Sequence, residues 1–184
     1  LGDGKLLRRD VYPLLGIVER YDRRTLTRLY LPFSPQEVAA GRADRGLADG
    51  DRIHLFATDD IRSLEKPADA ASDDKADGES ELAMLAAVLD PAIVAVIGER
   101  TVQVRGAVRD PGGYPVADRT PLESLIAAAG GLSADADPTV AELTAANGTR
   151  SSIDLSRDGS RSVGPGDALR INPRPQALES RAVA

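Results

Sequence analysis

Three polar side chains near the middle of the chain have the chemistry to bind a ligand that carries a carboxylate. Arg105, Arg109 and Tyr114 occur within one short stretch. A guanidinium can donate two parallel hydrogen bonds to a carboxylate, and a tyrosine offers a flat ring with a hydroxyl at its edge. The alternative is that both arginines are solvated and the tyrosine packs on a turn. We therefore treat these three residues as candidate ligand-binding residues.

Catalytic and metal-binding groups are scarce. His54 is the only histidine, and the chain has no cysteine. Within residues 52–56 it falls on the strand face opposite Ile53 and Leu55, which we expect to face inward, so a solvated histidine is favoured over a catalytic base. The composition leaves no multi-histidine or thiolate zinc site. No nucleophile-elbow, phosphate-loop or dinucleotide-binding glycine motif occurs. We expect no catalytic residue, no metal and no cofactor.

The candidate residues lie around a predicted hairpin. Residues 102–108 alternate apolar or small residues with polar ones, the period of a strand with one buried face. A turn follows, in which Pro111 has its φ preset and Gly112 can take a positive φ, the pattern of a type II turn. The chain is then expected to reverse into a short strand at residues 114–116.

A short amphipathic helix is predicted after the hairpin. Thr120 is suited to cap it, Pro121 suits the first helical position, and Glu123 completes a capping box. Apolar residues follow at helical spacing, namely Leu122, Leu125, Ile126 and Ala129. Gly130 or Gly131 is expected to end the helix, because a residue without Cβ adopts the left-handed conformation easily.

The order of strand, Pro-Gly turn, strand and helix ending in Ala-Gly-Gly resembles the SLBB module, a soluble-ligand-binding β-grasp domain of bacterial outer-membrane polysaccharide export proteins. The residues that carry the resemblance are Val104, Gly106, Val108, Arg109, Pro111, Gly112, Tyr114, Leu122, Ile126, Ala129, Gly130, Gly131 and Leu132. The resemblance implies an α+β fold of β-grasp modules, each with about five strands and one main helix. Gly106, Pro111, Gly112, Gly130 and Gly131 are expected to be structural residues of this motif.

A second, partial copy of the module is indicated earlier in the chain. The matched residues are Leu47 with Val163, Gly50 with Gly166, Asp51 with Asp167, Ile53 with Leu169, and Leu55 with Ile171. Both aspartates are expected to accept hydrogen bonds from nearby backbone N–H groups in the turn before a strand. Two copies of one fold are the simplest explanation, and the first copy lacks the opening strand, turn, strand and helix.

These patterns divide the chain into four parts. We expect a partial SLBB-like module at 1–58, an acidic flexible linker at 59–80, a complete SLBB module preceded by a short helix at 81–175, and a tail at 176–184. The short helix is expected at 81–89, ended by Asp90 and Pro91. The net charge of −6 is concentrated in the linker, and neither flanking part is basic enough to indicate nucleic-acid binding. Because the chain begins without an initiator methionine or signal peptide, we interpret it as a fragment of a longer protein.

The resemblance implies a structural and binding role rather than catalysis. It implies the periplasmic part of an outer-membrane-associated protein that exports capsule or exopolysaccharide. Such a part would contact polysaccharide, form a homo-oligomer in the full-length protein and meet an inner-membrane polysaccharide copolymerase. The alternative is a stand-alone β-grasp module of a periplasmic adhesin or sensor that binds a soluble saccharide. Assembly would favour the first role, and a monomer with specific glycan affinity would favour the second.

Overall fold

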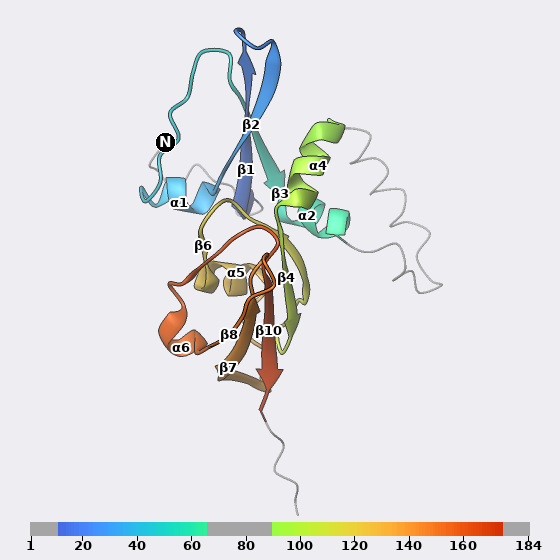
Figure 1. The fold of residues 1–184 in the computed structure, drawn as a ribbon, viewed down its shortest axis with the longest axis vertical. Coiled ribbons are helices and arrows are strands. Elements are labelled where there is room, and N and C mark those ends of the chain that lie inside the picture. The colour runs from blue at the N-terminus through green and yellow to red at the C-terminus, as the bar shows by residue number, and fades with distance from the viewer. Residues whose placement is uncertain (1–10, 66–89, 175–184) are drawn as a thin grey trace, which may run out of the picture.

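The chain folds into two modules that lie one after the other along the longest axis of the molecule (Figure 1). The structure is a computed structural model and describes residues 11–65 and 90–174. Each module has its own sheet, and short helices cover the sheets. The fold is α+β, as the sequence predicts.

The sheet of the first module is antiparallel and has the strand order β2-β1-β3. Its strands are β1 (Val11–Asp22), β2 (Thr27–Phe33) and β3 (Arg52–Ala57). The β1–β2 turn is held by the Asp22 carboxylate, which accepts a hydrogen bond from the Arg24 N–H at 2.8 Å. This Asx-type bond is a local signal that aspartate supplies at turns.

The sheet of the second module is mixed and has the order β5-β4-β10-β7-β8. Strand β10 pairs in parallel with β4, and all other neighbours are antiparallel. Its strands are β4 (Thr101–Gly106), β5 (Gly112–Pro115), β7 (Ala136–Thr144), β8 (Arg150–Ile153) and β10 (Ala168–Pro173). A separate small ladder joins β6 (Thr120–Pro121) to β9 (Ser162–Val163). Five strands in the main sheet match the expectation for a β-grasp module.

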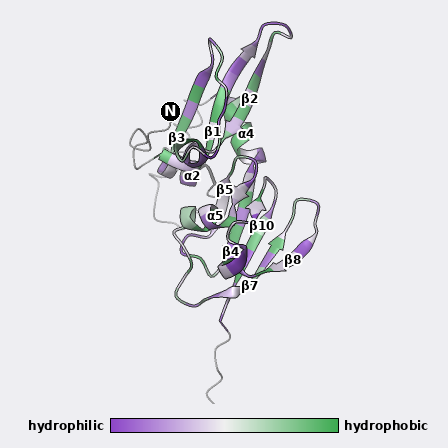
Figure 2. Cartoon of the chain, turned by 90° about the vertical axis from the view of Figure 1, so that its left-hand side faces the viewer, coloured by the Kyte–Doolittle hydropathy of each residue, from purple (hydrophilic) through white to green (hydrophobic). Residues whose placement is uncertain are grey.

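The described helices are short. They are α1 (Pro35–Ala39), α2 (Thr58–Glu65), α4 (Pro91–Glu99), α5 (Leu122–Ala128) and α6 (Leu155–Asp158). Helix α5 contributes Leu122 and Leu125, both fully buried, to the hydrophobic core that also contains Val104, Leu169 and Ile171 of the second sheet. Figure 2 shows hydrophobic segments along the strands of both sheets.

One hydrophobic core runs through both modules. It contains Tyr12, Leu14 and Ile61 from the first module together with Val104 and Leu125 from the second. Two hydrogen bonds cross between the modules inside this core. The Ala117 N–H donates to the Leu14 carbonyl at 2.9 Å, and the Tyr12 hydroxyl donates to the Pro115 carbonyl at 2.9 Å. The modules are therefore joined by apolar burial and by satisfied buried polar groups.

The predicted cap of helix α5 is wrong. Thr120 and Pro121 form strand β6, and the Thr120 hydroxyl donates to the Ala117 carbonyl at 3.1 Å instead of capping the helix. The first helical N–H groups are satisfied by distant backbone, because Leu122 donates to Arg161 and Glu123 donates to Gly159, both at 2.9 Å. Tertiary pairing thus replaces the local capping box. The helix ends as expected, since Gly130 and Gly131 have φ values of 74° and 91°.

The predicted type II turn is also wrong. Gly112 does not adopt positive φ; it opens strand β5 and pairs with Val104. The left-handed residue is Gly106, at the end of β4, with a φ of 88°. The connection is longer than a tight turn because Val108 forms an isolated bridge with Leu132 beyond the end of the strand.

The two faces of strand β3 are the reverse of those predicted. Ile53 and Leu55 are each 46% exposed, whereas His54 is partly buried on the opposite face. His54 Nε2 lies 3.0 Å from the Glu19 carboxylate, and Arg28 lies 3.3 Å from the same carboxylate. The alternation of the two faces along the strand was predicted correctly. The sequence of the strand does not show which face is buried, because that depends on distant parts of the chain that pack against it.

The structure also bears on the expected linker and helix. Residues 58–65 form helix α2, so the first part of the segment expected as a linker at 59–80 is helical. Residues 66–80, the helix expected at 81–89 and the tail expected at 176–184 lie outside the described residues. Within the described residues, Asp90 caps α4, accepting the Ala92 N–H at 3.0 Å, and Pro91 is at the start of that helix. Proline at the first helical position costs no hydrogen bond, which makes this arrangement favourable.

Candidate functional site

The loop between β4 and β5 presents Arg109 at the junction of the two modules. Its backbone is fixed to the end of helix α5, where the Arg109 N–H donates to Gly131 and the Asp110 N–H donates to Ala129, both at 3.1 Å. Glycine is favoured at position 130 because its φ is 74°, a conformation that strains residues with a Cβ; such a Cβ would also lie 2.8 Å from an Asp110 carboxylate oxygen, which would have to move. The motif glycines therefore position the loop that carries the candidate arginine.

A groove of about 360 Å³ runs beside this loop. The second module lines it with residues 109–114, and the first module lines it with Tyr12, Thr58, Ile61 and Arg62. The groove is therefore shaped by two modules and could not be formed by the hairpin alone. Its lining combines apolar side chains with charged groups, the composition of many small-ligand sites.

The charges in this groove are not balanced. The Arg62 guanidinium forms an ion pair with the Asp110 carboxylate at 3.1 Å, and both side chains are half exposed. Arg109 is exposed, and its guanidinium makes no hydrogen bond or ion pair with any residue that the structure describes. Among the described lining residues, one guanidinium is left over to meet an anionic group. A carboxylate is its natural partner, because its two oxygens fit the guanidinium fork.

The three candidate residues do not meet in one site. Arg109 and Tyr114 both line the groove, but Arg105 does not. Arg105 is exposed in β4 and pairs in register with Arg170 of β10, on the face opposite the buried Val102 and Val104. It belongs to the outer surface of the second sheet.

Tyr114 has a structural part in the groove. It is 5% exposed, and its hydroxyl donates to the Asp110 carbonyl at 2.5 Å. This bond spans the loop and holds Asp110 close to Arg62. Little of the ring is left for a sugar to stack on, so Tyr114 contributes by shaping the loop.

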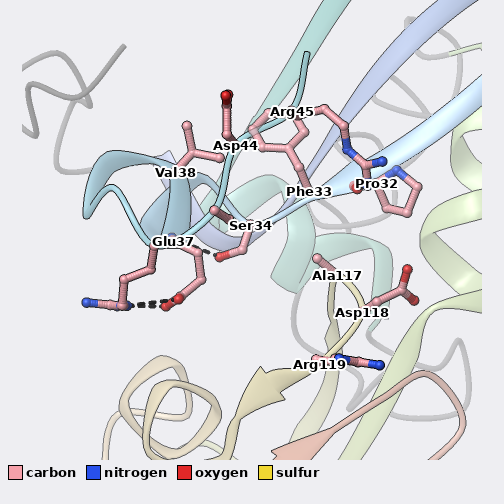
Figure 3. A pocket seen from close by; sticks show the side chains of 12 residues that line it. Pro32, Phe33, Ser34, Glu37, Val38, Asp44, Arg45, Ala117, Asp118 and Arg119 are labelled. Atoms are coloured by element: carbon pink, nitrogen blue, oxygen red, sulfur yellow. Dashed lines mark hydrogen bonds and ion pairs between the residues drawn. The ribbon is translucent and has the colours of Figure 1, made fainter.

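A second cleft, of about 310 Å³, opens between helix α1 and the segment that leads to β6 (Figure 3). Ser34, Glu37 and Val38 lie on one side, and Asp118 and Arg119 lie on the other. Helix α1 is capped by the Ser34 hydroxyl, which accepts the Glu37 N–H at 3.3 Å.

The charges of this second cleft are largely paired. Glu37 accepts two hydrogen bonds from Arg42, at 2.9 and 2.7 Å, and these lower its pKa. Asp118 forms an ion pair with Arg100, and Arg45 donates to the Pro32 carbonyl at 2.5 Å. Arg119 has a φ of 59°, which is rare for a residue with a Cβ. The lining of this cleft carries as many acidic as basic side chains, whereas the groove has one more arginine than carboxylate, so the groove attracts an anion more strongly.

The two motif aspartates hold equivalent turns. The Asp51 carboxylate accepts the Ala48 N–H at 2.8 Å, and the Asp167 carboxylate accepts the Gly164 N–H at 2.9 Å. Asp51 also accepts two hydrogen bonds from Arg20, which lower its pKa to about 2. Asp167 instead reaches the Ala146 N–H at 2.9 Å. Both residues support strands and lie outside the groove.

The sequence did not indicate several residues of these sites. Arg62 lies in a segment predicted to be linker, and its contact with Asp110 joins residues 48 positions apart. Arg42, Arg45 and Arg119 carry no motif either. Only the tertiary packing brings these residues to the groove or the second cleft.

Within residues 11–65 and 90–174, no group of three or more histidine, cysteine, aspartate or glutamate residues could hold a metal ion. No helix in the same ranges is long and apolar enough to cross a membrane.

Comparison with protein families identifies the second module. Residues 101–162 match the family model of the SLBB domain, and no curated protein matches the chain. This part of the chain is therefore an SLBB domain, the soluble-ligand-binding β-grasp domain of polysaccharide export proteins. The match ends before β10, which pairs with both β4 and β7, so the folded module extends to Pro173.

SLBB is a ligand-binding, non-catalytic domain family, and its members occur in the periplasmic parts of export proteins. The family supports a role in binding polysaccharide. One wall of the groove beside Arg109 belongs to the matched segment, and the other wall belongs to the first module.

Proposed function

We propose that this chain is a non-catalytic periplasmic part of a capsule or exopolysaccharide export protein, and that the groove beside Arg109 contacts the polysaccharide. The observation that carries the proposal is the exposed Arg109 guanidinium in a groove whose other described charges, Arg62 and Asp110, are paired with each other. The SLBB match supports the ligand class.

The groove favours a sugar that bears a carboxylate. Arg109 would donate two hydrogen bonds to a uronate, while the Arg62–Asp110 pair would hold hydroxyl groups. The backbone of Gly112 and Gly113 lines the same groove and leaves room for a ring to lie close to the chain. Stacking contributes little because Tyr114 is buried, so charge and hydrogen bonds would supply most of the specificity.

Titration of the ¹⁵N-labelled chain with tetragalacturonate tests this proposal. We expect amide shifts at residues 109–113 and at Arg62, and none with maltotetraose at the same concentration. Arg109→Gln should weaken the binding of tetragalacturonate roughly ten-fold or more, because a charge-assisted contact is lost. Arg23→Gln is the matched control, since Arg23 is exposed in the distant β1–β2 turn.

Two results would contradict this use of the groove. One is equal binding of the acidic and the neutral tetrasaccharide, and the other is an Arg109→Gln variant that binds as well as the parent chain. Equal binding with shifts confined to Arg119 and Asp118 would assign the contact to the second cleft instead.

We also propose that the full-length protein is a homo-oligomer attached to the outer membrane that meets an inner-membrane polysaccharide copolymerase. The polar outer face around Arg105 is available for such contacts. Light scattering after size-exclusion chromatography, over a range of concentrations, tests self-assembly of the chain. A strict monomer that binds the acidic tetrasaccharide would favour the other candidate function, a stand-alone saccharide-binding module of an adhesin or sensor.

A further inference from the structure

The two modules share a strand arrangement that shows what the first one lacks. In each module a β-hairpin leads to a short helix and then to a strand that pairs antiparallel with the first strand of the hairpin. The order β2-β1-β3 thus corresponds to β8-β7-β10. Ile53 of β3 pairs with Val18, and its counterpart Leu169 of β10 pairs with Leu143, so each has an apolar residue of the neighbouring strand opposite it.

The edges of the two equivalent strands differ. Strand β10 has a second neighbour, β4, whose Gln103 N–H donates to the Asp167 carbonyl at 3.0 Å. At the other end of this pair the Ala107 N–H donates to the Ile171 carbonyl at 2.9 Å. Among the residues that the structure describes, β3 pairs only with β1. No strand in residues 11–65 or 90–174 occupies its second edge, which could accept a parallel strand.

The apolar side chains next to this edge differ in the same way. The exposed fractions are 48% for Leu47 against 2% for Val163, 46% for Ile53 against 1% for Leu169, and 46% for Leu55 against 0% for Ile171. In the second module, Val163 pairs with Thr120 of β6, and β4 flanks Leu169 and Ile171. All the partners that the first module lacks therefore belong to one continuous segment, from β4 to α5.

From this comparison we propose that the open face of the first module, defined by Leu47, Ile53 and Leu55, is a docking site for a strand-turn-strand-helix segment carried before Val11 on the same polypeptide. The order of elements gives the direction. In the second module the β4–α5 segment precedes β7 and is joined to it by residues 129–135. Because β1 corresponds to β7, the equivalent segment would precede β1.

The site also defines the chemistry of its occupant. The first strand would run parallel to β3, with apolar residues at alternate positions that continue the face of Ile53 and Leu55. A glycine, the counterpart of Gly106, would end that strand beside the Leu55 carbonyl. An amphipathic helix would follow and cover the same face, as α5 covers its own sheet.

A second copy of this chain is a poorer occupant. Its own β4 and α5 are already built into its second module, where Val104, Leu122 and Leu125 are each 0% exposed. Offering them to a neighbour would require that core to open. The proposal rests on the internal duplication and not on saccharide binding, so it stands or fails independently of the proposed function.

Hydrogen exchange at residues 52–56 tests the proposal. Two proteins would be compared: the chain of 184 residues, and the same chain with a second copy of its own residues 101–135 placed ahead of residue 1. We expect exchange at residues 52–56 to slow at least ten-fold in the extended protein, and the binding of a hydrophobic dye to fall.

Two variants of the extended protein serve as controls. Val102→Asp with Val104→Asp in the added copy removes its apolar face, and Leu55→Glu places a charge in the site. Both should restore fast exchange at residues 52–56. Equal exchange in all four proteins would overturn the proposal. Slow exchange in the original chain, together with a dimer by light scattering, would also overturn it and assign the face to a second copy.

Discussion

Gly106 of β4 lies directly against the carbonyl of Ile171 in β10. A Cβ on Gly106 would be 2.0 Å from the Ile171 oxygen, and the same oxygen accepts the Ala107 N–H at 2.9 Å. The motif glycine therefore allows the two parallel strands to close at their ends. Its φ of 88° adds a second reason why another residue would be strained.

Gly106→Ala is expected to destabilise the protein by more than about 2 kcal/mol, because it combines a backbone clash with an unfavourable φ. Urea denaturation followed by circular dichroism would measure the change. Gly112→Ala is the matched control in the same hairpin, since no atom lies within 4 Å of its added Cβ. Similar losses in the two variants would refute this account of Gly106.

The equivalent positions Leu169 and Ile53 should differ sharply in stability. Leu169→Ala is expected to cost about 2–5 kcal/mol, because it leaves a cavity in a packed core. Ile53→Ala should cost less than about 1 kcal/mol, since 46% of Ile53 is already exposed. Chemical denaturation of both variants gives the comparison. A large loss for Ile53→Ala would mean that its face is covered in solution.

Stability at acid pH should depend on Asp51. Hydrogen bonds from Arg20 lower its pKa to about 2 in the folded protein, whereas an unfolded aspartate has a pKa of about 3.9. The stabilisation is therefore complete above about pH 4 and is lost as the pH falls towards 2. Asp51→Asn should lower the melting temperature at pH 7. Between pH 4 and pH 2, the melting temperature of this variant should fall less than that of the parent protein. Asp49→Asn, in the same turn, is the control and should keep the acid dependence of the parent protein. If the melting temperature of Asp51→Asn fell with pH as steeply as that of the parent, the result would be evidence against a stabilising Arg20–Asp51 pair.

Replacing both helix-ending glycines should destabilise the second module. Gly130→Val with Gly131→Val is expected to cost more than about 1 kcal/mol, because β-branched residues tolerate positive φ poorly. Gly98→Ala is the comparison variant and should have the opposite effect on stability. Gly98 lies in helix α4, and no atom lies within 4 Å of a Cβ added there. This substitution should raise stability by about 0.5–1 kcal/mol. Thermal denaturation would measure both, and an unchanged melting temperature in the double variant would rule out the proposed helix end.

Local signals in the sequence predicted local structure well. The strand that starts near residue 102, the helix end at Gly130 and the turns before β3 and β10 all depend on residues close together in the chain. The errors came from tertiary contacts. Thr120 pairs with β9 instead of capping a helix, and Ile53 is exposed because nothing described covers it.

The candidate site was predicted only in part for the same reason. Arg109 belongs to the hairpin motif, so its position followed from the pattern. The other wall of the groove comes from α2 of the first module, and no spacing in the sequence relates Arg62 to Asp110. Tyr114 was expected near the surface, but its hydroxyl has a backbone partner that allows the ring to be buried.

The core shared by the two modules governs how the molecule comes apart. Tyr12 and Leu14 are buried against the second module, and their hydrogen bonds to Pro115 and Ala117 cannot be replaced by water while the core is closed. Cutting the backbone between residues 65 and 90 would therefore leave two pieces that stay associated. The protein should melt in one transition, and a pulling force applied to one module would be carried to the other through side chains as well as through the backbone.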